Sequence, residues 1–126
     1  MPMEFVEVNW LAVIVGAAVA FGLSFLWFGP LFGRAWAAGS HNITRPERMP
    51  LLALACYGAG TLALAVVVGV TATTDSLLTA VAAIVGTAAL LFSLGLFSQK
   101  TAGAALIDAG AILVMGAVMI LAQGLF

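Results

Sequence analysis

Four apolar stretches, each about as long as a membrane-spanning helix of 20 residues, constrain this chain more than any other feature. They cover approximately residues 8–29, 49–70, 76–97 and 102–123 of the 126. At about 1.5 Å per residue, each stretch forms a helix about 30 Å long, which matches the hydrocarbon thickness of a bilayer. Backbone groups in lipid must be hydrogen-bonded within their own segment, so four transmembrane helices are expected. The predicted fold class is an all-α integral membrane protein with a single domain.

The composition supports this class and excludes others. Only 7% of the residues are charged and 64% are hydrophobic, whereas soluble domains carry about 25% charged residues. The net charge of −1 and the lack of a basic cluster give no indication of nucleic-acid binding. We also find no phosphate-binding loop, no metal-ligand spacing and no nucleophile beside a base, so we expect neither an enzyme nor a cofactor or metal.

Gly29 and Pro30 end the first apolar stretch, and aromatic residues surround this break. We predict a short interfacial helix over residues 31–38, entered at Pro30 and ended near Gly39. Aromatic side chains favour the headgroup level of a bilayer, so we expect them to form a collar in contact with lipid. The members of this predicted aromatic collar are Trp10, Trp27, Phe28, Phe32 and Trp36.

Helix-start signals precede two of the later spans. Residues 44–47 (Thr-Arg-Pro-Glu) fit a capping box with proline in the first turn, which predicts a helix start before the second span. Ser98 or Thr101 is expected to cap the fourth.

The charged side chains predict an orientation. The four basic residues all lie in the first and third connections: Arg34, Arg45, Arg48 and Lys100. Glu4 and Glu7 precede the first span, and Asp75 lies in the second connection, on the opposite side. The positive-inside rule therefore places both termini outside, in a multi-pass protein of the bacterial inner membrane.

The first span carries a small residue at every fourth position: Ala12, Gly16, Ala20 and Ser24. We call this set the packing ribbon, because small residues allow two helix backbones to approach closely. The ribbon could pack inside one chain or form a contact in a homo-oligomer. A weaker ribbon in the second span consists of Ala55, Ala59 and Ala63.

Asp108 is the one carboxylate inside a predicted span, about 10 Å from the nearer end of its helix. A central Asp costs about 3 kcal/mol on insertion scales, so a partner, protonation or a water-filled cavity must offset it. Similar depth and charge predict one polar layer of Asp108, Ser24, Tyr57, Ser93 and Arg34. Arg34 and Lys100 are the nearest cations, and Arg34 is the better bidentate partner. Either Asp108 forms a structural tie, to Arg34 or to the Ser and Tyr hydroxyls of the layer, or the layer handles a proton or cation.

Several short motifs carry a resemblance to a known family. They are Asn9-Trp10-Leu11-Ala12-Val13, Leu26-Trp27-Phe28, Phe32-Gly33-Arg34-Ala35-Trp36, Asp108-Ala109-Gly110 and Met115-Gly116. In these motifs the chain resembles the bacterial four-helix membrane family known only as domain of unknown function 1761. Phe28 stands where that family usually has Tyr, and Ala111 where an aromatic residue is common. The resemblance implies the fold and supplies no activity.

Two functions remain open at this point. One is an oligomeric transporter or channel for a proton, a cation or a small amphiphile, using the layer around Asp108. The other is a non-transporting scaffold or accessory subunit of a larger membrane complex. Both imply contact with membrane lipid, and a homo-oligomer is expected. A water-accessible cavity that reaches Asp108 would favour transport, whereas a dry and fully paired Asp108 would favour the scaffold.

The orientation yields the first testable prediction. Single cysteines introduced at position 75 and within residues 40–48 should react with an impermeant thiol reagent from opposite sides of the membrane. The background for this labelling carries Cys56→Ser, which removes the native thiol. Reaction of both positions from the same side would contradict four spans.

Overall fold

The computed structural model describes residues 7–44 and 50–126. The helices are α2 (Trp10–Leu26), α3 (Gly33–Gly39), α4 (Leu51–Ala72), α5 (Leu77–Phe97) and α6 (Ala102–Leu125), with a π-helical turn, η1 (Trp27–Leu31), between the first two. Apart from Thr44, the residues of the predicted capping box at 44–47 lie outside the described residues.

The described residues form helices and connections and contain no strand. Four helices are long and apolar enough to cross a membrane: Trp10–Leu31, Leu51–Ala72, Leu77–Phe97 and Ala102–Leu125, with mean hydropathies of 2.2 to 2.3. The chain is therefore an all-α, multi-pass membrane protein with a short helix after its first span. The predicted fold class is confirmed.

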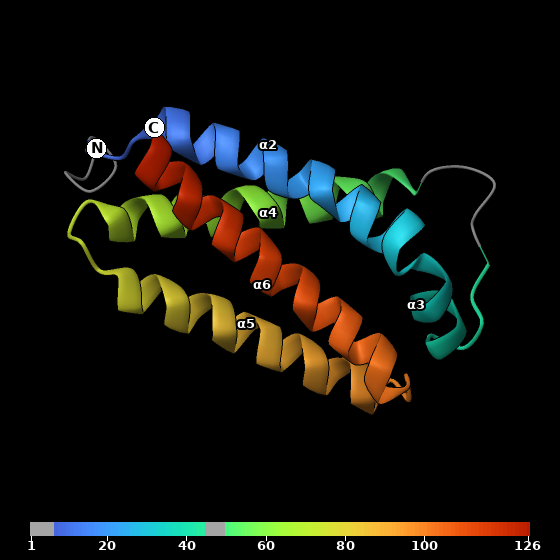
Figure 1. Ribbon diagram of the computed structural model, residues 1–126. Helices are drawn as coiled ribbons and strands as arrows, with labels where there is room; N and C mark the ends of the chain where they lie inside the picture. Colours follow the sequence, from blue (N-terminus) through green and yellow to red (C-terminus); the bar gives the residue numbers. More distant parts are fainter. Residues whose placement is uncertain (1–6, 45–49) are drawn as a thin grey trace.

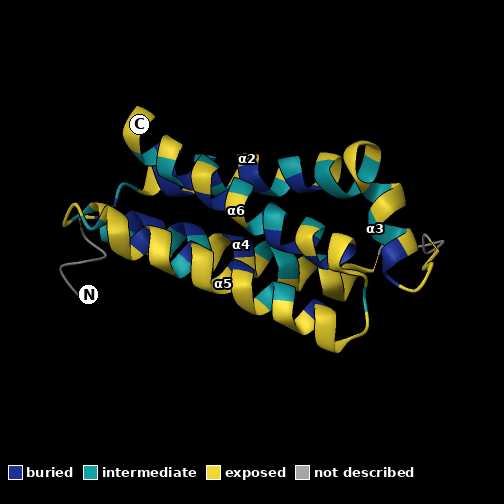
Figure 2. Ribbon diagram, turned by 60° about the horizontal axis from the view of Figure 1, so that its bottom comes forward, coloured by how far each residue is buried: buried dark blue, intermediate teal, exposed yellow. Residues whose placement is uncertain are grey.

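Helix α6 is the centre of the bundle. It runs obliquely between α2 and α5, and α3 covers its beginning (Figure 1). In its apolar stretch 44% of the residues are buried, against 17% in α4 and in α5. Figure 2 shows the buried residues facing the middle of the bundle, and much of α5 exposed. Helix α6 therefore contacts each of the other long helices, while α4 packs more extensively on α2.

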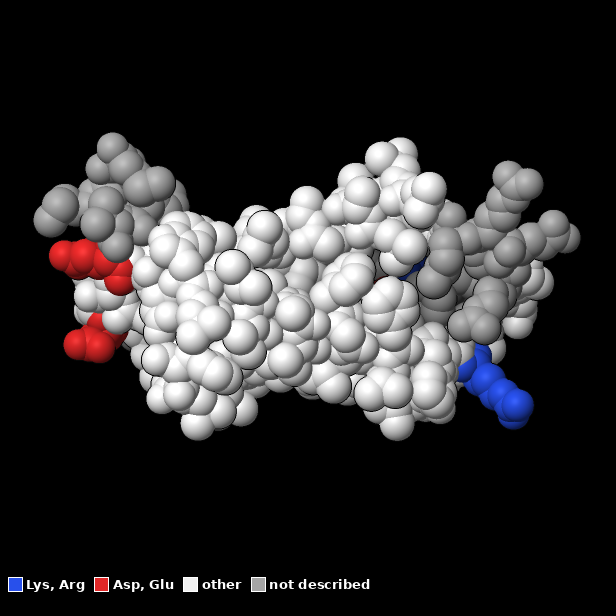
Figure 3. Space-filling view, turned by 90° about the horizontal axis from the view of Figure 1, so that it is seen from above, with Lys and Arg blue, Asp and Glu red and all other residues white. Residues whose placement is uncertain are grey.

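The charged ends of the bundle are segregated. The start of α2, the end of α6 and the α4–α5 connection lie at one end, and α3 and the α5–α6 connection at the other (Figure 1). Accordingly Glu7 and Asp75 lie at one end, and the described basic residues Arg34 and Lys100 lie toward the other, where the third described acidic residue, Asp108, is paired with Lys100. Figure 3 shows red acidic side chains at one extremity and a blue basic side chain at the opposite one.

The packing ribbon of α2 is buried within the chain. All four of its residues are buried, Ala12 and Ala20 almost completely. At Gly16 an added Cβ would lie 3.2 Å from the Ala122 Cβ and 3.3 Å from the Met119 Cα, both on α6. Two uses of this ribbon were left open by the sequence. In the structure it packs inside one chain, against α6. The weaker ribbon of α4 is exposed at all three positions.

Small residues also bring α5 against α6. An added Cβ at Gly95 would lie 3.0 Å from the Ala105 Cβ, and one at Gly116 would lie 2.5 Å from the Ile84 side chain. Lipid tails are as apolar as the core, so close packing rather than hydrophobic burial must hold these helices together. The two glycines supply that closeness near both ends of the α5–α6 contact.

The α2–α6 contact predicts a difference between two glycines of the same helix. Gly16→Leu should lower the free energy of unfolding by about 1–3 kcal/mol, because it inserts a side chain into a filled contact. Gly22→Leu is the matched control, since an added Cβ there meets no atom within 4 Å. Thermal unfolding in detergent measures both. Equal stability of the two variants would contradict the α2–α6 packing.

Candidate functional site

A break at the end of α2 sets up the site. Gly29 has φ −109° and ψ −106°, outside the helical region, and the Phe32 N–H donates to the Trp27 carbonyl at 3.0 Å. The predicted short helix is present as α3, but it begins at Gly33 rather than at Pro30, which lies inside the preceding π-helical turn. Gly33 fits because an added Cβ would lie 2.7 Å from the Phe28 carbonyl oxygen. The break turns α3 onto the beginning of α6.

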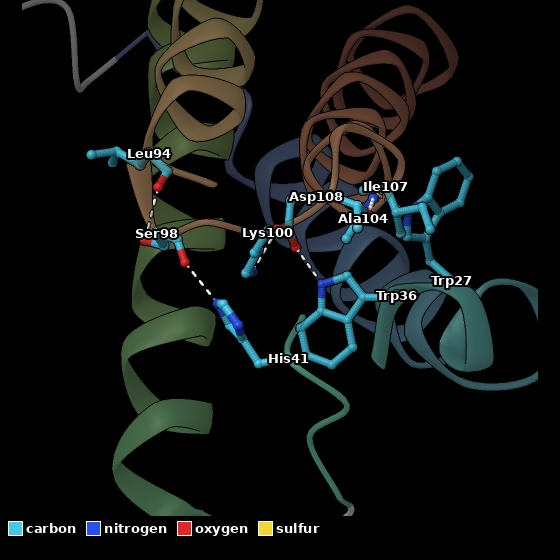
Figure 4. Close-up of polar contacts among 10 residues, drawn as sticks. Trp27, Trp36, His41, Leu94, Ser98, Lys100, Ala104, Ile107 and Asp108 are labelled. Atoms are coloured by element: carbon cyan, nitrogen blue, oxygen red, sulfur yellow. Dashed lines mark hydrogen bonds and ion pairs between the residues drawn. The ribbon is translucent and has the colours of Figure 1, made fainter. Parts of the chain in front are cut away.

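Asp108 lies on α6 under this turn and is 8% exposed. The Lys100 Nζ donates to its Oδ2 at 2.8 Å, and the Trp36 Nε1 donates to its Oδ1 at 2.8 Å (Figure 4). The Lys100 Nζ also lies 5.3 Å from the centroid of the Trp36 ring, within cation–π range. We call these three side chains the Asp108 cluster. Both carboxylate oxygens are occupied by donors from the protein.

The α5–α6 connection delivers Lys100 to Asp108. Gln99 takes φ 63°, and the Gln99 and Lys100 N–H groups donate to the Leu96 and Gly95 carbonyls at 3.0 Å, the Schellman pattern of a helix end. Thr101 then starts α6, accepting a hydrogen bond from the Ala104 N–H at 3.1 Å. Of the two predicted caps, Ser98 and Thr101, the structure uses Thr101. This tight turn folds Lys100 back over the first turns of α6.

The same connection also binds the end of α3. The Thr101 N–H donates to the Gly39 carbonyl at 2.9 Å, and an added Cβ at Gly39 would overlap the Thr101 Oγ1. The His41 Nε2 lies 2.7 Å from the Ser98 carbonyl oxygen (Figure 4). Helix α3 is therefore held at both its Trp36 side chain and its carboxyl end.

Arg34 is not the partner of Asp108 in the structure. It is exposed on α3 and forms no ion pair with any described residue. Arg34 and Trp36 are two positions apart, about 200° around a helix, so one face of α3 cannot present both to α6. The ion pair of Asp108 is made with Lys100 instead.

Ser24 and Tyr57 form a second, separate group. Their hydroxyl oxygens are 2.8 Å apart, and the Tyr57 hydroxyl donates to the Met115 Sδ at 3.2 Å. Met115 is two turns further along α6 than Asp108, about 10 Å away. Ser93 is exposed on α5 and belongs to neither group. In place of the one predicted polar layer, the structure has two clusters at different depths.

The two tryptophans at this end, both members of the predicted collar, donate hydrogen bonds to α6. The Trp27 Nε1 donates to the Ile107 carbonyl at 2.8 Å, and its ring covers Gly110, where an added Cβ would lie 2.9 Å from it. Indole N–H groups seek acceptors when they are buried, and α6 supplies one for Trp27 as it does for Trp36.

The two phenylalanines of the predicted collar lie on opposite sides of the break and pair with different tryptophans. The ring of Phe32 lies 4.6 Å from that of Trp27, and the ring of Phe28 lies 5.2 Å from that of Trp36. Trp10, at the start of α2, lies at the opposite end of the bundle. Four of the five predicted collar residues are therefore one aromatic layer around the start of α6.

Asp108 lines none of the five grooves and cavities formed by the described residues. Five grooves or cavities of about 190 to 620 Å³ have neither Asp108 nor Lys100 in their linings. The described residues also contain no group of three His, Cys, Asp or Glu side chains that could hold a metal ion. Of the Asp108 cluster, Trp36 borders a groove of about 620 Å³ that Arg34 also lines, while Asp108 itself is bound by protein donors at both oxygens.

Three contacts at this end of the bundle were not predicted from the sequence. They are the packing of Trp27 on Gly110, the hydrogen bond from Tyr57 to Met115, and the hydrogen bond from Trp36 to Asp108. The signal for two of them lies in the short motifs. Asp108-Ala109-Gly110 supplies the carboxylate for Trp36 and the bare backbone for Trp27 within three residues.

Comparison with known proteins yields one match. The sequence family described as "Protein of unknown function (DUF1761)" matches residues 11–124, nearly the whole chain. No curated protein matches. No solved structure matches either.

The Asp108 cluster predicts which pair of residues is energetically coupled. Asp108→Asn and Lys100→Gln should each destabilise the bundle, and the double variant should recover about 1–3 kcal/mol relative to their sum. Asp108→Asn combined with Arg34→Gln is the control and should be additive, since Arg34 is exposed and lies off the cluster. Thermal unfolding in detergent gives all the values. Coupling to Arg34 with none to Lys100 would refute the observed pairing.

Proposed function

Since the chain belongs to the DUF1761 family, which has no assigned activity, we propose its function from its own residues: a non-transporting, non-enzymatic scaffold or accessory subunit of a complex in the bacterial inner membrane. The observation that carries this proposal is the pairing of Asp108 with Lys100 and Trp36. A buried carboxylate whose two oxygens are both occupied by protein donors has the features of a structural tie.

Transport through Asp108 would require a different arrangement. A carrier or channel site must exchange its internal partners for a substrate and must reach water on at least one side. Asp108 is 8% exposed, and Lys100 lies 2.8 Å from it. Replacing Lys100 by a proton or cation would leave a lysine without its counter-ion in a low-dielectric surrounding, which is costly. The geometry therefore favours the scaffold over the transporter.

The tie gives the bundle a fixed surface at one end. Trp36 and Gly39 anchor α3 to α6 and to the α5–α6 connection. Arg34 consequently projects from a helix that is held in place. A rigidly displayed cation beside the membrane surface is a suitable contact for an acidic segment of a partner subunit.

The charge distribution supports the proposed orientation. The described basic residues Arg34 and Lys100 lie toward one end of the bundle, and Glu7 and Asp75 lie at the other (Figure 3). With the α3 end on the cytoplasmic side, both chain termini are outside.

Flux measurements separate the two functions. Purified protein in liposomes loaded with a pH-sensitive dye should pass protons no faster than protein-free liposomes under an imposed gradient, and potassium gradients should give the same result. The double variant Lys100→Gln with Asp108→Asn removes both charges together and should behave as the wild type does. A wild-type flux that disappears in the folded double variant would overturn the scaffold proposal.

A further inference from the structure

A groove of about 620 Å³ lies along α3, where the chain leaves its first span. Phe28 and Pro30 line it from the break that ends this span, and Ile43 lines it from the connection that follows α3. Helix α3 itself contributes Arg34 and Trp36 among its lining residues. We call it the α3 groove. Its volume is typical of sites that hold small molecules, about 300–1,000 Å³.

The α3 groove crosses the boundary of the hydrocarbon layer. Phe28 and Pro30 belong to the first span, which ends at Leu31, whereas Arg34 lies beyond that end. Trp36, which also borders the groove, is of a residue type that favours the headgroup level of a bilayer. A molecule that fills the groove must therefore present apolar surface to one part of the lining and polar groups to the other.

The positive charge of the α3 groove is not neutralised by the described part of the protein. Arg34 is exposed and has no ion-pair partner among the described residues. No carboxylate is among the described residues that line the groove. A guanidinium stays protonated at every physiological pH and binds phosphate through two parallel hydrogen bonds. The polar group that fits this part of the groove is therefore an anion, and phosphate matches it best.

The α3 groove is preformed, because α3 is held in place. The Trp36 Nε1 donates to Asp108 at 2.8 Å (Figure 4), and the ring of Phe28 lies 5.2 Å from that of Trp36. At the other end of α3 the Gly39 carbonyl accepts a hydrogen bond from the Thr101 N–H. A site that exists before its ligand arrives avoids the cost of ordering its walls on binding.

We propose that the α3 groove binds an anionic phospholipid of the adjacent leaflet, with its phosphate on Arg34 and the first part of an acyl chain against Phe28 and Pro30. Such a lipid carries phosphate and hydrocarbon at the level where the groove has its cation and its apolar lining. An acidic segment of a partner subunit is the competing occupant, but it would pair with Arg34 and leave the apolar lining unused. The proposal does not rest on the scaffold function.

Native mass spectrometry of the full chain tests the site. The protein in detergent micelles is mixed with equal amounts of phosphatidylglycerol and phosphatidylcholine with identical acyl chains, and the lipids retained on the protein are counted. Phosphatidylcholine is the reference, because its choline neutralises the same phosphate. The wild type should retain phosphatidylglycerol several-fold more. A large excess of inorganic phosphate should not release it, since phosphate alone makes no contact with the apolar lining.

Variants at three positions of α3 separate a site from general charge attraction. Arg34→Gln should lower the retention of phosphatidylglycerol several-fold, and Ala37→Leu should do the same by filling the groove. Ala35→Leu is the matched control and should change nothing, because Ala35 is exposed and outside the lining. Arg34→Gln with Ala35→Arg keeps the net charge of the chain but moves the cation, so it should not restore retention. Thermal unfolding verifies that each variant is folded.

Three outcomes would overturn the proposal. Equal retention of the two lipids by the wild type, or full retention by the variant with the moved cation, would mean that no specific site exists. Release of the lipid by inorganic phosphate would mean that the apolar lining takes no part in binding. Binding of a hexaglutamate peptide in preference to phosphatidylglycerol would mean that the groove takes an acidic segment instead.

Discussion

One buried carboxylate, that of Asp108, determines how α3 and the α5–α6 connection lie against α6. Asp108 accepts one hydrogen bond from Lys100 and one from Trp36, each at 2.8 Å. A charge at this depth is tolerated only when it is paired and hydrogen-bonded. Leaving it unpaired destabilises a protein several times more than the loss of an exposed ion pair does. The two donors come from α3 and from the α5–α6 connection, so satisfying Asp108 requires both segments to lie against α6.

The break after α2 is needed for the same reason. A straight helix through Trp36 would carry that indole away from Asp108, whereas the turn at Gly29 and the bare backbone at Gly33 bring α3 back over α6. Trp27 is placed on Gly110 by the same turn. Trp27 and Trp36 are thus internal contacts of α6, and the packing ribbon of α2 continues the contact along the rest of the helix.

The fold could be predicted because span length and backbone satisfaction in lipid leave few alternatives. The spacing of small residues in α2 allowed two interpretations, and packing inside one chain was one of them. The residues concerned are Ala12, Gly16, Ala20 and Ser24. The site was harder to predict, since periodicity gives the face of a residue only while a helix stays regular. The irregular turn at Trp27–Leu31 lies between Phe28 and Trp36, so regular helix spacing could not predict that Trp36 meets Asp108. The αL conformation of Gln99, which aims Lys100 at Asp108, has no glycine to signal it.

The central claim is that Asp108 is a dry structural tie to Lys100. Solid-state NMR on protein labelled with ¹³C and ¹⁵N in phospholipid bilayers tests it most directly, through the dipolar contact between the Lys100 Nζ and the Asp108 carboxyl carbon combined with polarisation transfer from water. The structure, with Nζ 2.8 Å from Oδ2 and Asp108 8% exposed, predicts a strong contact and little transfer from water to that carbon. Rapid transfer from water to Asp108 with no contact to Lys100 would contradict the account.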